Sequence, residues 1–337
     1  MNLDAIFGDG GGTFALALPG LVLGLVLLMA GGQLVVREAA TLAARLGISP
    51  IVIGVVIAGF GTSAPELATA VRASLAGTPG LAFGNAVGAS MANLLTVLGL
   101  AAFLAPLHIA PSAIRAEIVA VIVAAAVFVL PGLLPTLAQP GGFVMLCGLA
   151  LWMAYSLRGQ FRAAAAVQSA ALQAREAAAL VNPSEPQWRA AALLVVGIGL
   201  LVAGADLLVS AAITLARRMG IGEDILGLTL LSVGTCLPEM ATAFAAVRKR
   251  QPDIVIGNVL GSCLFNILAV GGVVHAMAGT ARLSSGEMFD RLSLLAASLG
   301  VGFLLLRRSP LRKGSAVLLI TVYGLWLAIR LLAMSGD

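Results

Sequence analysis

Two short polar stretches inside apolar sequence have the residue types of a metal-cation site. The first reads GTSAPE and ends at Glu66, and the second reads GTCLPE and ends at Glu239. In each stretch the proline has no N–H, so the carbonyl four residues earlier loses its helical partner. A carboxylate, neighbouring hydroxyls and a freed carbonyl supply the oxygen ligands that hard cations such as Ca²⁺ take. The two stretches therefore predict an oxygen-lined site for a hard cation.

A second pair of stretches adds side-chain amides. One reads GNAVGASMAN and ends at Asn93, and the other reads GNVLGSCLFN and ends at Asn266. An amide in an apolar span costs free energy unless it finds partners, so both asparagines are candidate ligands. The glycine spacing in these stretches also allows close contact between helices. For the glycines alone, packing explains the pattern equally well.

The paired stretches belong to an internal repeat of the chain. Glu239 minus Glu66 gives an offset of 173, and the same offset aligns the flanking sequence without a gap. A fixed offset of this kind is the signature of a duplicated structural unit. The aligned pairs include Gly31 with Gly204, Thr62 with Thr235, Pro65 with Pro238, Pro79 with Pro252, Asn85 with Asn258, Asn93 with Asn266 and Gly99 with Gly272.

The composition is that of an integral membrane protein. The chain of 337 residues is 60% hydrophobic and only 10% charged, whereas about 25% of a soluble domain is charged. Apolar runs of about 20 residues recur, which is the length that crosses a hydrocarbon core of about 30 Å. We expect ten transmembrane helices, at 15–36, 48–72, 80–104, 115–133, 140–158, 189–211, 222–247, 253–276, 289–306 and 314–334.

These spans divide the chain into two halves. We expect a first five-helix repeat at 1–158, a short cytoplasmic connection at 159–188 and a second five-helix repeat at 189–337. The matched glutamates lie in the second and seventh spans, so the two repeats have opposite orientations in the membrane. Inverted repeats are a transporter architecture, with the site near the membrane midplane where the repeats meet. The predicted fold class is an all-α polytopic membrane protein made of two inverted five-helix repeats.

Basic residues set the expected orientation. Of the 20 Lys and Arg residues, 14 fall in alternate loops on one side, and the positive-inside rule places that side in the cytoplasm. Both termini are then predicted outside, in the cytoplasmic membrane of a prokaryote. The pair Arg217–Arg218 goes against the rule. The six basic residues assigned to the outer side are Arg72, Arg217, Arg218, Arg282, Arg291 and Arg330.

Carboxylates inside a membrane are functional hypotheses by default, because each costs several kcal/mol unless it is partnered. Glu66 and Glu239 could instead sit at helix ends or pair with an arginine, but this leaves their repetition in matched motifs unexplained. Asp206, in the sixth span, is a separate case because its repeat mate is Gln33. We expect Asp206 either to help an ion path or to hydrogen-bond a helix end.

Other classes of function fit the sequence less well. It contains no Ser-nucleophile or metal-ligand constellation, so we predict no catalytic residue and no cofactor, and an intramembrane hydrolase is disfavoured. His108 and His275 lie near span ends and are expected to be solvated or structural. The net charge of +5 sits in short loops and indicates no nucleic-acid partner. A membrane scaffold without transport remains an alternative, and the sequence leaves the oligomeric state open, a monomer included.

At these motifs the chain resembles the cation/calcium exchanger superfamily, in its sodium/calcium exchanger branch of prokaryotic type. The two GT-x-x-PE stretches and the two GN-x-x-G-x-x-x-x-N stretches resemble that family's two alpha repeats. The resemblance covers both repeats and the ten-span plan. It implies ion sites between the second, third, seventh and eighth spans, with the first and sixth spans sliding against the rest during transport.

The resemblance also implies which residues hold the ions. Glu66 and Glu239 would be the central carboxylates, shared by Ca²⁺ and Na⁺. Thr62 and Thr235 would add hydroxyls and backbone carbonyls. The outer sites would be completed by Ser63, Ser262, Asn93 and Asn266.

The sequence departs from the family pattern at two positions. Cys236 stands where the first repeat has Ser63, and Ala89 stands where the second repeat has Ser262. Each departure removes a hydroxyl that the family uses around Na⁺ or water. Asn266 bears on a different ion: the potassium-dependent branch carries an acid there, so we expect no K⁺ dependence.

The predicted function is therefore a secondary antiporter that exchanges Ca²⁺ for Na⁺ by alternating access. The alternative on the same scaffold is a H⁺/Ca²⁺ antiporter, which the two lost hydroxyls favour. In either case an empty site would leave two unpaired buried charges, which are strongly destabilising. The empty protein should thus resist switching, so each passage across the membrane has to carry ions.

Overall fold

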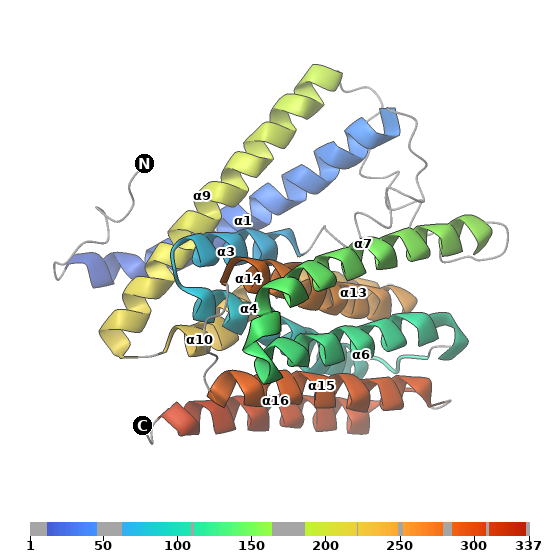
Figure 1. Cartoon of the computed structure of the whole chain (residues 1–337). Helices are drawn as coiled ribbons and strands as arrows, with labels where there is room; N and C mark the ends of the chain where they lie inside the picture. The colour runs from blue at the N-terminus through green and yellow to red at the C-terminus, as the bar shows by residue number, and fades with distance from the viewer. Residues whose placement is uncertain are drawn as a thin grey trace.

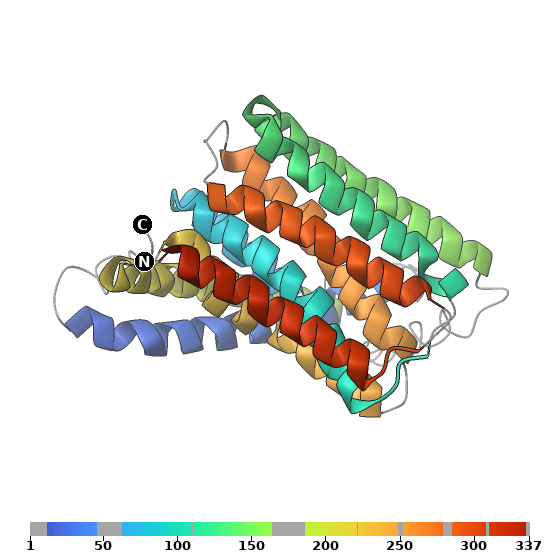
Figure 2. The ribbon, with the colours of Figure 1, turned by 90° about the horizontal axis from the view of Figure 1, so that it is seen from below.

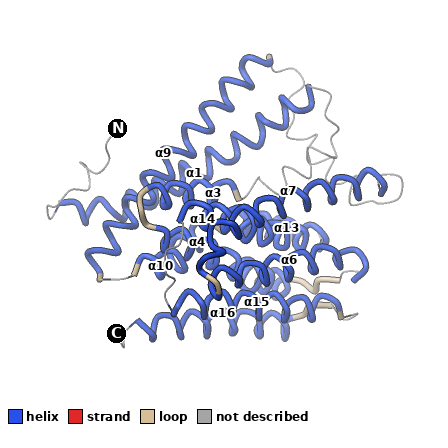
Figure 3. Tube along the Cα trace, viewed as in Figure 1, coloured by secondary structure: helices blue, strands red, loops and turns tan. Residues whose placement is uncertain are grey.

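The computed structural model describes residues 12–45, 63–108, 111–163, 186–220, 222–248, 252–278, 285–307 and 310–334. Regular structure in these residues is helical (Figure 3), apart from one isolated antiparallel bridge between Leu107 and Leu311. The prediction of an all-helical protein is confirmed. Thr62 and most of the span predicted at 48–72 lie outside the described residues.

The helices follow the predicted spans along the chain. In the first half they are α1 (Gly12–Arg45), α3 (Ala64–Leu75), α4 (Pro79–Met91), η2 (Ala92–Val97), α5 (Leu98–Leu104), α6 (Pro111–Leu133), η3 (Pro135–Leu137) and α7 (Ala138–Ala163). In the second half they are α9 (Gln187–Met219), α10 (Glu223–Leu226), η4 (Gly227–Leu231), α11 (Ser232–Thr235), α12 (Leu237–Arg248), α13 (Pro252–Phe265), η5 (Asn266–Val270), α14 (Gly271–Ala278), α15 (Ser285–Leu306) and α16 (Lys313–Met334).

Eight of the described segments are long and apolar enough to cross a membrane. A ninth candidate is the bent pair Gly227–Thr235 and Leu237–Arg248, whose two parts meet at 45°. The protein is thus a multi-pass membrane protein, and each of these segments coincides with a predicted span. The full count of ten, and the division at 158 and 189, stay predictions.

Two of the spans form the centre of the bundle. About 78% of the most apolar window is buried in Pro79–Leu104 and in Ile254–Met277, against 17–39% in the other spans. Helices α15 and α16 pack along this centre (Figure 2), and α6 and α7 flank it on another side. Helices α1 and α9 run together and lean away from the other spans (Figure 1).

Each central span contains a short π-helical segment. The first is η2, which carries Asn93, and the second is η5, which begins at Asn266. A π segment inserts an extra residue into an α-helix and is frequent at functional sites. The two segments fall at repeat-equivalent positions, so the asparagines that the sequence selected share the same local backbone.

The crossing of α1 and α9 is made by glycines. A Cβ on Gly24 would lie 3.0 Å from the Gly204 carbonyl oxygen, and one on Gly31 would lie 2.8 Å from the Gly197 carbonyl oxygen. Gly24 and Gly197 are repeat mates, as are Gly31 and Gly204. Each glycine therefore contacts the mate of the other, which is the contact pattern that two symmetry-related helices make.

Two basic residues lie elsewhere than the sequence predicted. Arg291 and Arg330 were assigned to outer loops, but they lie inside α15 and α16 with only 0% and 6% of their surface exposed. Arg330 is buried because it pairs with Asp290, at 3.0 Å. Neither residue counts toward the loop charge that predicts orientation.

We predict that Gly204→Val disrupts the α1–α9 crossing. The added side chain would meet the Gly24 carbonyl oxygen at about 2.9 Å, and overpacking of this kind costs about 1–3 kcal/mol. The apparent melting temperature in detergent should fall. Gly199→Val on the same helix is the matched control, because a Cβ there meets nothing within 4 Å. Equal melting temperatures for the two variants would contradict the packing argument.

Candidate ion-binding site

Glu66 lies at the start of α3. The helix begins at Ala64, with Pro65 in its first turn, where a missing N–H costs nothing, and Ser63 directly before it. Glu66 and Ser63 are fully buried. A carboxylate in the first turn is favoured by the helix dipole. The proline therefore starts a helix whose N-terminal end supports a buried negative charge.

Glu239 occupies the equivalent place in the second repeat. Helix α11 ends at Thr235, the chain turns at Cys236, and α12 begins at Leu237 at an angle of 45°. Glu239 is fully buried in the first turn of α12. The helix is therefore bent just before Pro238 in this copy.

The two glutamates come together inside the protein. The carboxylate of Glu66 lies close enough to Glu239 and to the Thr235 hydroxyl to interact electrostatically with both. The Thr235 hydroxyl also donates to Asn85 Oδ1, at 3.4 Å. Neither oxygen of Glu66 makes a well-formed hydrogen bond within the described residues. Two carboxylates from different repeats thus share one buried, oxygen-rich region.

The predicted amides are buried in the same central spans. Asn93 and Asn266 are fully buried, and within the described part of the chain neither the nitrogen nor the oxygen of either side chain has a hydrogen-bond partner. A buried polar atom without a partner costs about 1–3 kcal/mol. The two amide oxygens, one in each π-helical segment, are atoms that a bound cation could satisfy, whereas the two amide nitrogens only donate and would need an acceptor such as water.

The remaining predicted ligands differ in what the structure says of them. Thr235 contacts both Asn85 and Glu66. Ser262 is fully buried on α13. Thr62 lies outside the described residues. Cys236 is buried and interacts electrostatically with both glutamates, and its thiol donates to the Ala89 carbonyl at 3.6 Å.

The two departures from the repeat pattern meet each other. Cys236 packs with Ala89 and Ala92 in a small apolar cluster that Tyr323 of α16 borders. Cys236 replaces the serine of the first repeat, and Ala89 replaces the serine of the second. The two lost hydroxyls therefore belong to one location beside the glutamates and not to two independent ones.

Two groups in this region were not predicted from the sequence. Asn85 is fully buried and accepts the Thr235 hydroxyl; its repetition as Asn258 was the signal that could have identified it. The Tyr323 hydroxyl is buried without a hydrogen-bond partner in the described part of the chain. No sequence pattern marks Tyr323, because α16 has no polar motif that repeats in the first half.

Asp206 pairs with a basic side chain. It forms an ion pair with Arg72 near the end of α3. A part for Asp206 in an ion path stays a prediction. The pairing also shows that Arg72, the basic residue of α3, pairs with Asp206 and not with Glu66.

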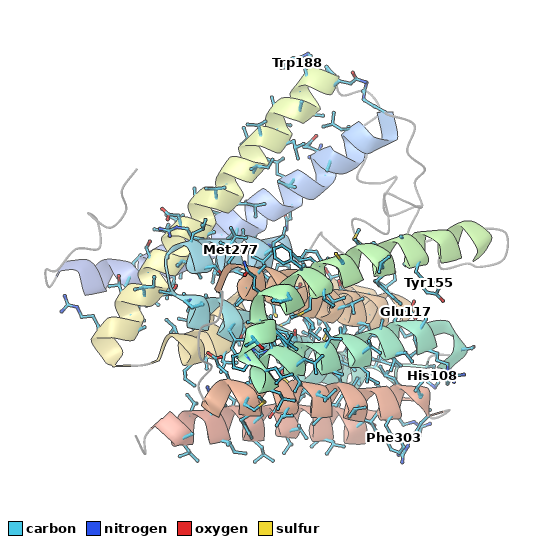
Figure 4. All side chains as sticks on the ribbon, viewed as in Figure 1. His108, Glu117, Tyr155, Trp188, Met277 and Phe303 are labelled. Carbon is cyan, nitrogen blue, oxygen red and sulfur yellow. The ribbon has the colours of Figure 1, made fainter. Side chains whose placement is uncertain are left out.

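One histidine is exposed and the other is buried. His108 is exposed and lies toward the same end of the bundle as Glu117 and Tyr155 (Figure 4). His275 is buried and structural: its Nδ1 contacts the Gly271 carbonyl at 2.6 Å, and its Nε2 lies 2.8 Å from an Arg291 nitrogen. Since guanidinium only donates, the imidazole accepts at Nε2 and donates from Nδ1. The Arg291 guanidinium lies 4.7 Å from the ring centroids of both Phe83 and Phe128, which stack on each other.

Comparison with known proteins gives one consistent family. The family model described as "Sodium/calcium exchanger protein" matches residues 16–158 and 189–332. The inner membrane protein YrbG of Escherichia coli is 32% identical over 323 residues, covering 92% of this chain and 95% of YrbG. The sodium/calcium exchanger MaX1 of Methanosarcina acetivorans is 26% identical over 307 residues, covering 75% of this chain and 81% of MaX1.

The fold has a close structural relative as well. A solved structure of the sodium–calcium exchanger NCX_Mj, soaked with Na⁺ and Sr²⁺, aligns with a TM-score of 0.62 and 25% identity. The alignment covers 93% of this chain and 98% of that one. The likeness therefore extends over the whole helical arrangement and is not confined to one repeat.

We predict that Glu66→Gln and Glu239→Gln each weaken Ca²⁺ binding. Removing one full charge beside a divalent cation at a buried site should lower affinity about 10- to 100-fold, since such charges interact by several kcal/mol. Isothermal titration calorimetry with Ca²⁺ measures this. Glu117→Gln is the matched control, because Glu117 is a partly buried carboxylate at the end of the bundle near His108. Wild-type affinity in both site variants would rule out the site.

Proposed function

Because the chain belongs to the sodium/calcium exchanger family, we propose that it exchanges Ca²⁺ for Na⁺ across the cytoplasmic membrane of a prokaryote. Membership makes it a multi-pass membrane transporter of inorganic cations, an antiporter of the cation/Ca²⁺ type, and not an enzyme. The transported ions are its substrates, and the family uses no cofactor. We also propose that both termini lie on the outer side of the membrane.

One observation supports the ion site most directly. Glu66 and Glu239, fully buried and repeat-equivalent, lie close enough to interact. Two like charges in a low-dielectric interior repel each other and each loses its hydration, which costs several kcal/mol per ion. A divalent cation between them removes both penalties. In our proposal Ca²⁺ is held there by the two carboxylates, with the Thr235 hydroxyl and the amides of Asn93 and Asn266 completing the oxygen shell.

The two carboxylate charges also explain why the protein would exchange ions and would not let Ca²⁺ pass alone. In the proposed cycle the two inverted repeats swap conformations, which turns the site from one face to the other. With Ca²⁺ bound, or with monovalent cations bound, the two carboxylates are neutralised and the switch is permitted. With no cation bound, the protein would have to change conformation while two buried negative charges stay unneutralised. Coupling therefore follows from the carboxylates themselves.

A second candidate, H⁺/Ca²⁺ exchange, is favoured by the Cys236–Ala89 contact. The two serines that these residues replace would have supplied hydroxyl oxygens beside the glutamates, and a thiol and a methyl group are poor ligands for Na⁺. Protons need no such ligands, because they bind the carboxylates directly. In this proposal the residues at positions 236 and 89 determine whether Na⁺ or H⁺ is the coupling ion. The Ca²⁺ site is the same for both candidate functions.

We predict that Ca²⁺ enters proteoliposomes preloaded with Na⁺. A matched set without Na⁺ carries only a pH gradient, and Glu66→Gln should abolish uptake in both sets because the central carboxylate is lost. Uptake of ⁴⁵Ca²⁺ is the measurement. Uptake driven only by the pH gradient would replace Na⁺ by H⁺ as the coupling ion. No ion-driven uptake in either set would contradict the exchange function itself.

We predict that the double change Cys236→Ser with Ala89→Ser steepens the Na⁺ dependence of Ca²⁺ flux. Because Cys236 and Ala89 are in contact, the two restored hydroxyls should act together, so the double variant should exceed the sum of the single variants. The Hill slope and half-saturating Na⁺ concentration are measured for all three. Cys147→Ser, at the exposed cysteine of α7, is the control. A Na⁺ dependence unchanged from wild type would show that this side of the site takes no part in coupling.

A further inference from the structure

A single ion pair connects Glu66's helix to the helix pair that leans out of the bundle. The Arg72 guanidinium on α3 pairs with the Asp206 carboxylate on α9, and the side chains are only 31% and 23% exposed. Arg72 lies three residues before α3 ends at Leu75, where the chain turns into α4. The ion pair thus joins α9 to the end of a helix that carries a predicted ion ligand.

The rest of the α3–α9 contact is loose and apolar. A groove of about 430 Å³ lies between α1, α3 and α9. Small and aliphatic side chains line it, among them Ala64, Ala68, Val71 and Ala205, with Arg72 at its border. Apolar surfaces in a membrane gain little by touching each other, because lipid is equally apolar. The ion pair is therefore the specific polar link at this contact.

The link exists in one repeat and has no counterpart in the other. Asp206 minus 173 is residue 33, which is Gln33 on α1, and Arg72 plus 173 is residue 245, which is Ala245 on α12. Neither mate carries a charge. When inverted repeats exchange conformations, a contact between α3 and α9 becomes a contact between α12 and α1. At those positions the exchanged conformation has an amide and a methyl group in place of an ion pair.

We propose that Arg72 and Asp206 are a gating pair of the exchange cycle, which favours the conformation described here over its symmetry-related counterpart. The proposal rests on the alternating-access function proposed above. The ion pair makes the populations of the two access conformations unequal, although the two repeats have similar sequences. The pair positions α9 against α3 and touches neither transported ion, so it sets the balance between the two conformations and leaves the ligands of the site unchanged.

The expected bias is modest. A partly exposed ion pair shifts an equilibrium by about twofold to fivefold. Since apparent affinity scales with the fraction of protein open to a given face, loss of the pair must raise the apparent Ca²⁺ affinity at one face and lower it at the other. Damage to the site or to folding would instead move both values in the same direction.

The test uses full-length protein in proteoliposomes of known orientation, with half-saturating Ca²⁺ measured separately at each face. Arg72→Gln should shift the two values in opposite directions. Charge exchange, Arg72→Asp with Asp206→Arg, should bring both back toward wild type. The mirrored pair, Gln33→Asp with Ala245→Arg, built into the wild-type chain, should shift the two values in the same sense as Arg72→Gln, because it stabilises the other conformation. Arg307→Gln, directly after α15, is the matched control, since Arg307 is exposed and its guanidinium lies over the Phe303 ring, at a distance from α9 (Figure 4).

Values that stay unchanged, or move together, in Arg72→Gln would overturn the gating proposal while leaving exchange intact. Absence of flux in the wild type would instead overturn the exchange function.

In that case the rate of amide hydrogen–deuterium exchange at Arg72–Thr78 tests the gating proposal, because this measurement does not depend on transport. The mirrored pair on α1 and α12 should speed exchange at this distant segment, because it favours the conformation in which α9 leaves α3. An unchanged rate there would contradict the proposal.

Discussion

The repulsion between two buried carboxylates is the constraint on which the rest of the molecule depends. Glu66 and Glu239 are held close together inside apolar helices, where charge is costly and water is scarce. A cation between the two carboxylates would remove their repulsion, so under the proposed function the feature that binds the ion also opposes an empty site. In that proposal affinity and coupling have one physical origin.

The fold places both carboxylates at the starts of helices. Helix α3 starts two residues before Glu66, and α12 starts two residues before Glu239, so both carboxylates lie at positive helix ends. The π-helical segments bring Asn93 and Asn266 into the same buried layer. Outside this layer the glycine crossing of α1 and α9 gives close contact without side-chain interlocking, which suits helices that change position.

The sequence predicted the buried polar residues that recur in both repeats. Glu66, Asn93 and their mates stood out because a polar residue recurred at one offset in apolar sequence, and their burial is confirmed. Arg291 and Arg330 were misplaced because a lone charge near a span end looks like a loop residue until its partners are known. The contact between Cys236 and Ala89 joins residues 147 apart, and only packing of α4 against the second repeat reveals it.

The proposed mechanism requires that the site does not turn from one face of the membrane to the other while both carboxylates are charged and no cation is bound. Na⁺-free proteoliposomes containing a pH-sensitive dye test this requirement, by comparing labelled Ca²⁺ exchange against internal Ca²⁺ with net Ca²⁺ uptake into Ca²⁺-free vesicles. We predict rapid Ca²⁺–Ca²⁺ exchange and no net uptake unless protons move in return. Sustained net uptake without any counter-ion movement would show that the empty site turns freely and that the carboxylates do not couple the two ion movements.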